Sequence, residues 1–176
     1  TETIPGQDIT ECYGIVTGST VRTKHIGRDI MAGLKNLVGG ELTGYTELLQ
    51  EARQDALARI NADASQAIAI GYSLVVLSDR AMGTDRIAIS ALLAVGSVHH
   101  ALVAKAERSQ IGLVVETGEA REVHHFCVLA GYGAEAINPY VAFETLEELR
   151  VRKDMPLDAK TVQKNYIKAV GKGILK

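Results

Sequence analysis

The sequence has little that would mark a specialised class of protein. Its 176 residues include only two cysteines and three prolines, and tryptophan is absent. Cys12 and Cys127 are too far apart for the short spacing of metal or redox motifs. Disulfide-bonded frameworks belong to oxidising compartments, so a chain without one is expected to work in a reducing cytoplasm.

An excess of charge of one sign is also lacking. Lys and Arg total 19 and Asp and Glu total 21, for a net charge of -2, which argues against a nucleic-acid partner. No apolar run approaches the roughly 20 residues needed to cross a bilayer, and residues 1–7 do not resemble a secretory signal. We therefore expect neither a nucleic-acid nor a membrane partner. The 47% hydrophobic and 23% charged residues are typical of a globular domain.

Short apolar runs alternate with helical patterns from residue 66 onward. This pattern predicts strands over residues 72–79, 111–118 and 134–140, and helices over residues 89–105, 120–130, 143–152 and 158–170. Strand–helix alternation is typical of a parallel sheet. Gly131 is expected to end its helix as a C-terminal cap.

The first part of the chain has a different character. Residues 9–23 are rich in Val, Ile, Thr and Tyr, which favour strands, and residues 25–40 have helical spacing. A long helix over residues 43–69 is predicted to bury a stripe of Leu48, Leu49, Ala52, Ala56, Ile60, Ala64 and Ala67. The predicted fold is therefore α/β, with an α+β segment over residues 1–65 and a βαβαβα unit over residues 66–176.

Polar residues follow each predicted strand of the second part. The carboxyl ends of parallel strands meet at one edge of the sheet, where ligands bind. The candidate pocket at the strand ends consists of Asp79, Arg80, Glu116, Glu119 and Asn138. An alternative interpretation is purely structural, with Thr117 or Glu119 near a helix start and Asp79–Arg80 as an ion pair.

Two histidine pairs fall within predicted helices, His99–His100 and His124–His125. Metal sites on one helix use spacings of three or four residues, which neither pair has. We expect structural imidazoles, one of each pair facing the sheet; a metal site formed by all four is the alternative. Cys127 is expected to be a buried, inert thiol because its neighbours are apolar.

The end of the chain has a lysine at every fourth position: Lys160, Lys164, Lys168, Lys172 and Lys176. This spacing predicts a positively charged stripe on one helix. A solvated face and a phosphate-contacting face are both compatible with it.

Longer stretches resemble two known families. Residues 3–62 resemble the YbjQ family, also called UPF0145, in IPG at 4–6, YGIVTGSTVR at 13–22, GRDIMAGLKNLVGGEL at 27–42 and GYTELL at 44–49. The resemblance implies an α+β unit and assembly as a homopentamer. A metal role has been suggested for that family, but this segment has no clear cluster of metal ligands.

Residues 56–176 resemble the central domain of the glutamate synthase large chain. The similar stretches are GYSLVVLSDR at 71–80, AISALLAVGSVHHALV at 88–103, GLVVETGEAREVHHFCVLAGYGAEAINPY at 112–140 and KNYIKAVGKGILK at 164–176. That enzyme moves the amide nitrogen of glutamine to 2-oxoglutarate with flavin and an iron–sulfur cluster. Its catalytic cysteine, flavin barrel and cluster cysteines have no counterpart in the resembling stretch, so the resemblance implies no cofactor and no catalytic residue here.

Together the resemblances indicate a chimera whose halves join within one helix. The expected function is that of a composite scaffold, without catalysis of its own, that self-associates as a pentamer if the first half dominates. One alternative is a connecting segment of glutamate synthase that acts only with the missing domains. The other alternative is a metal-binding module.

Overall fold

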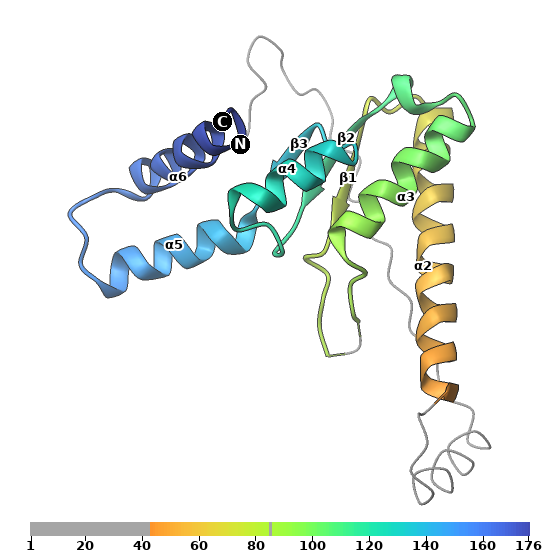
Figure 1. Ribbon diagram of the computed structural model, residues 1–176, viewed down its shortest axis with the longest axis horizontal. Coiled ribbons are helices and arrows are strands. Elements are labelled where there is room, and N and C mark those ends of the chain that lie inside the picture. The colour runs from red at the N-terminus through yellow and green to blue at the C-terminus, as the bar shows by residue number, and fades with distance from the viewer. Residues whose placement is uncertain (1–42, 85) are drawn as a thin grey trace, which may run out of the picture.

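The computed structural model describes residues 43–84 and 86–176, and they form the expected α/β arrangement (Figure 1). The strands and helices predicted for residues 9–40 lie outside the described residues. The elements run in the order α2 (Thr43–Ile70), β1 (Leu74–Ser78), α3 (Ala91–Ala104), the short 3₁₀ helix η1 (Arg108–Gln110), β2 (Gly112–Glu116), α4 (Val123–Gly131), β3 (Ala136–Asn138), α5 (Tyr140–Arg152) and α6 (Ala159–Ile174). The three predicted strands are confirmed, each shorter than expected.

The sheet is parallel and its strands follow chain order, β1-β2-β3. Their register places Ser78 beside Glu116, and Glu116 beside Asn138, so the last residues of the three strands are direct neighbours. Alternate residues bury one face of the sheet, with Val75 and Leu77 on β1 and Leu113 and Val115 on β2. The polar strand ends thus form one edge of a well-packed core.

Helices α2 and α3 pack along each other and against the buried face (Figure 1). Ala56, Ile60, Ala64 and Ala67 of the predicted stripe are buried, and small alanines let the two helices approach closely. Leu49 was expected in that stripe, but it is 62% exposed because it lies toward the start of α2, beyond the buried turns. The expected junction at residues 65–66 falls inside continuous α2, so the division into two segments stays a prediction.

Helix α6 packs against α4 and α5. Tyr166 links the three: its ring makes edge contacts with Phe126 and Phe143, and its hydroxyl donates to the carbonyl of Arg121. Asp158 caps α6 by accepting from the Thr161 amide at 2.7 Å. No helix among the described residues is long and apolar enough to span a membrane.

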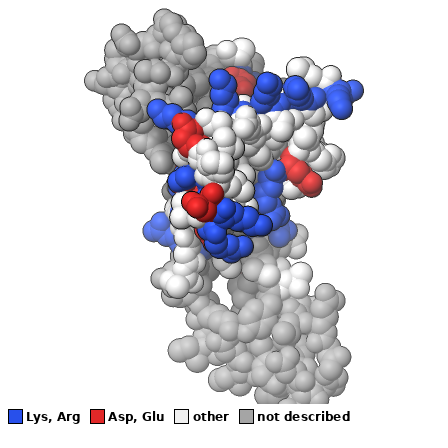
Figure 2. Space-filling view, turned by 90° about the vertical axis from the view of Figure 1, so that its left-hand side faces the viewer, with Lys and Arg blue, Asp and Glu red and all other residues white. Residues whose placement is uncertain are grey.

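The predicted lysine stripe lies on α6 and the two residues that follow it. Figure 2 shows a row of Lys and Arg along one edge of the molecule, and all five lysines of the stripe are exposed: Lys160, Lys164, Lys168, Lys172 and Lys176. The solvated face is therefore confirmed, and contact with phosphate stays a prediction.

The end of α4 differs from the expectation. Gly131 is still helical, and the left-handed residue is Gly133, with φ of 111°. A Cβ at Gly133 would lie 2.4 Å from Nδ1 of His99. Glycine is therefore needed two residues later than expected, where the chain turns closely past the His99 ring.

Candidate functional site

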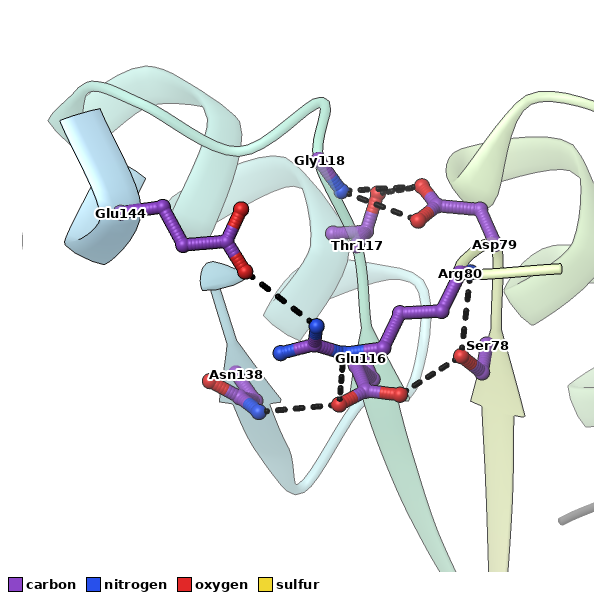
Figure 3. A network of polar contacts seen from close by, with 8 residues as sticks. All are labelled: Ser78, Asp79, Arg80, Glu116, Thr117, Gly118, Asn138 and Glu144. Atoms are coloured by element: carbon purple, nitrogen blue, oxygen red, sulfur yellow. Dashed lines mark hydrogen bonds and ion pairs between the residues drawn. The ribbon is translucent and has the colours of Figure 1, made fainter. Parts of the chain in front are cut away.

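The strand-end site is centred on the carboxylate of Glu116, the last residue of the middle strand (Figure 3). The Ser78 hydroxyl donates to Oε2 at 2.6 Å, and the Asn138 amide donates to Oε1 at 3.2 Å. Arg80 Nε also donates to Oε1, at 2.7 Å. The strand register explains this convergence, because Ser78 and Asn138 flank Glu116 in the sheet.

Arg80 reaches across the strand ends to two carboxylates. Besides Glu116 it contacts Glu144 of α5, with Nη1 and Oε1 3.2 Å apart, and its guanidinium lies 4.0 Å from the centre of the Tyr140 ring. The expected Asp79–Arg80 ion pair is therefore wrong. Adjacent residues leaving a strand point to opposite sides, which sends the two side chains to different partners.

Asp79 holds the loop that follows β2. Its carboxylate accepts from the Thr117 hydroxyl at 2.6 Å and from the Gly118 amide at 2.9 Å. Thr117 is completely buried. Burial, followed by a hydrogen bond to Asp79, raises the pKa of Tyr140 to about 12, so this phenol is neutral at pH 7.

Glu119 does not join the other candidates. Its carboxylate accepts from the backbone amide of Ala91 at 3.0 Å and from the Ser90 hydroxyl at 3.3 Å. It therefore caps the start of α3, where a negative charge is favourable. The structural interpretation holds for Glu119, although the helix it caps is α3 and not the helix that follows it in the chain.

The network has the chemistry of a fixed anion. Burial alone would raise the pKa of Glu116, but hydrogen bonds from Ser78 and Arg80, the charge of Arg80 and a hydrogen bond from Asn138 together lower it below the ordinary value. A carboxylate held ionised in this way is a poor proton donor at neutral pH. Its evident effect is to tie the ends of all three strands together.

A cleft of about 470 Å³ opens beside this network, between the sheet edge and helices α5 and α6. Of the five residues proposed from the sequence for a pocket, Arg80 and Asn138 line this cleft. The other lining residues were not predicted: Tyr140, Phe143, Glu144, Glu147 and Gln163. The signal available for Tyr140 and Glu144 was their position in the first turns of the helix after β3, next to the same edge.

Each histidine pair has one half-buried residue, His99 or His125, and one exposed residue, His100 or His124; that the half-buried ones face the sheet stays a prediction. His99 accepts from Arg108 Nε at 3.2 Å, and His125 accepts from the Arg121 amide at 3.1 Å. Across residues 43–84 and 86–176, no three His, Cys, Asp or Glu side chains come together as a metal site would require. This part of the chain therefore lends no support to a metal-binding module.

Cys127 is exposed, which corrects the expected buried thiol. Phe126 and Leu129 are the buried residues of α4, and the neighbouring position Cys127 lies about 100° around the helix from Phe126. Apolar neighbours in the sequence therefore did not place the thiol in the core.

Arg108 organises the opposite end of the sheet. Its guanidinium donates to the carbonyls of Ile111 and Gly133 and to the carboxylate of Glu135, in addition to His99. Burial, and then the positive charge of Arg108, lower the pKa of His99. The folded protein therefore favours the neutral ring, which alone can accept the Arg108 bond.

We expect stability to fall as the pH falls below about 6.5, the ordinary pKa of histidine, because the unfolded chain then binds a proton that folded His99 resists. The measurement is the melting temperature between about pH 7.5 and 5.5. His99→Gln should weaken the pH dependence in this window, whereas His124→Gln, at an exposed position, should leave it unchanged. Equal pH dependence of wild type and His99→Gln would contradict the assignment.

Comparison with known proteins gives two sets of relatives. The sequence model of the glutamate synthase central domain matches residues 30–176, starting earlier than the expected residue 56. The chain is 41% identical over 143 residues to glutamate synthase (NADH) of Saccharomyces cerevisiae, covering 77% of this chain and 6% of that enzyme. It is 38% identical over 129 residues to the glutamate synthase (NADPH) large chain of Bacillus subtilis, covering 73% of this chain and 8% of the relative.

The second set consists of UPF0145 proteins. The chain is 65% identical over 75 residues to the UPF0145 protein of Hahella chejuensis, covering 43% of this chain and 69% of that protein. The chain is thus similar to two kinds of protein over different parts of its length, which is consistent with a two-part, chimeric sequence. The chain spans less than a tenth of the glutamate synthases that it matches.

Proposed function

Because this chain belongs to the glutamate synthase central domain family and joins to it a UPF0145 segment, we propose that it is a non-catalytic scaffold related to the connecting part of glutamate synthase. The observation that carries the proposal is the bonding of Glu116 at the strand ends. Its carboxylate is engaged by Ser78, Arg80 and Asn138, which stabilises the sheet edge and leaves no oxygen poised for proton transfer.

A transplantation experiment tests the scaffold role. Residues 71–176 would replace the matching stretch of the Bacillus subtilis large chain, and glutamine-dependent formation of glutamate from 2-oxoglutarate would be measured. We expect activity within about tenfold of the parent, because a connecting segment supplies shape rather than reacting groups. A transplanted enzyme that folds and binds its flavin but has lost its activity would count against the proposal.

The isolated chain provides the complementary measurement. Incubated with glutamine, 2-oxoglutarate and reduced nicotinamide cofactor, it should consume cofactor no faster than buffer does. The matched variant is Glu116→Gln, which keeps the size of the side chain and removes the charge. Turnover by the wild type that this variant abolished would establish catalysis at the strand ends and refute the scaffold proposal.

The UPF0145 segment favours a second function, self-association. The similarity of 65% over 75 residues includes most of a complete UPF0145 protein. We expect a pentamer, with a native mass near five times 18.9 kDa by light scattering on a sizing column. A monomeric mass would show that this segment no longer directs assembly.

A further inference from the structure

The cleft beside the strand ends is lined by side chains of opposite charge, and a scaffold has no need of such a cleft. It lies at the carboxyl edge of a parallel sheet, the position at which α/β proteins bind small ligands. Arg80 and Glu144 of α5 both line it and form an ion pair at 3.2 Å, and Phe143 adds an aromatic lining residue. The cleft therefore presents opposite charges within one small space.

Arg80 retains donors for a ligand. Its Nε is used by Glu116 and one Nη1 hydrogen by Glu144, whereas among the described residues Nη2 donates no hydrogen bond. The Tyr140 ring beneath the guanidinium holds it in place. A carboxylate approaching from the cleft can thus bind an arginine whose position is already set by the protein.

The ion pair between Arg80 and Glu144 is weak enough for a ligand to replace either partner. The two side chains are 46% and 63% exposed, and exposed ion pairs are weak. Glu147 differs, because both of its carboxylate oxygens accept from Arg150. Glu144 is therefore the carboxylate that can leave its partner and accept an ammonium group.

We propose that this cleft binds a small zwitterion of the α-amino-acid class. The ligand's carboxylate binds Arg80 and its ammonium binds Glu144, so that each charge of the ion pair gains a new partner when the pair separates. The side chain of the ligand lies against Phe143, with Gln163 nearby as a polar contact. Polyphosphates are disfavoured because Glu144 and Glu147 repel additional negative charge.

Three matched probes test the charge requirement: norvaline, pentanoate, which lacks its ammonium group, and butylamine, which lacks its carboxylate. Backbone amide shifts of the full chain would be followed by NMR at millimolar ligand. We expect saturable shifts in α5 with norvaline and binding at least about tenfold weaker with either analogue. This binding does not depend on the scaffold proposal, since it involves no turnover and no other domain.

Two variants of the same helix test the location. Glu144→Gln should weaken norvaline binding at least about tenfold, whereas Glu148→Gln, an equally conservative change at an exposed residue outside the cleft, should leave it unchanged. Thermal unfolding would verify that both variants are folded. Absence of saturation by norvaline, equal affinity for pentanoate, or an equal loss in Glu148→Gln would overturn the proposal.

Discussion

Replacing Leu113 with alanine is expected to lower the free energy of unfolding by about 2–5 kcal/mol. Leu113 is completely buried in the middle strand, and it belongs to the core that α2 and α3 form with the sheet. The substitution removes apolar contacts and leaves a cavity that close-packed neighbours fill only partly. Unfolding in urea, followed by circular dichroism, would measure the change.

Leu93→Ala provides the matched control, because the same atoms are deleted from a side chain that is 39% exposed on α3. We expect that variant to lose less than about 1 kcal/mol. A similar loss in both variants would show that the buried face of the sheet is not the main source of stability.

The sheet was predictable because its strands are short apolar runs separated by helical patterns. Val75 and Leu77, like Leu113 and Val115, are buried as such runs require. The same logic placed Arg80, Glu116 and Asn138 at one edge. The hydrogen bonds among these three residues depend on the strand register. The composition of each strand does not specify that register, so the bonds could not be predicted.

Two of the errors have one physical cause, the difference between neighbours in sequence and neighbours in space. Asp79 and Arg80 are adjacent in the chain, yet Asp79 bonds to Thr117 while Arg80 bonds to Glu116. Cys127 follows the buried Phe126 on α4 but is itself exposed, because it lies outside the face that Phe126 and Leu129 bury. Local composition predicted the elements, whereas side-chain direction decided the contacts.

The cleft illustrates what sequence reasoning does not reach. Its floor contains predicted strand-end residues, but its walls come from α5 and α6. Their position depends on Tyr166, whose ring contacts Phe126 and Phe143 from separate helices. No short motif in the sequence encodes that packing, so Glu144 and Gln163 could not be placed beside Arg80 before the fold was known.

Asp79→Ala is expected to have the second large effect, a loss of about 2–4 kcal/mol in the free energy of unfolding. The completely buried Thr117 hydroxyl and the Gly118 amide both donate to this carboxylate. Removing the acceptor leaves them without these bonds, and unsatisfied buried donors are costly. Asp79→Asn, which keeps an acceptor oxygen at nearly the same place, should lose less than the alanine variant.

A double-mutant cycle measures how much of the Asp79→Ala loss comes from the Thr117 hydroxyl and not from the Gly118 amide. Thr117→Val deletes the buried hydroxyl, so the Asp79→Ala/Thr117→Val protein no longer contains that unsatisfied donor. We expect it to be more stable than the sum of the single losses predicts, by about 1 kcal/mol, since contacting residues couple by 0.5–3 kcal/mol in general. Strictly additive losses would mean that the bond between Asp79 and the Thr117 hydroxyl adds nothing to stability, and that Asp79 acts through its other partners, the Gly118 amide and the Tyr140 hydroxyl.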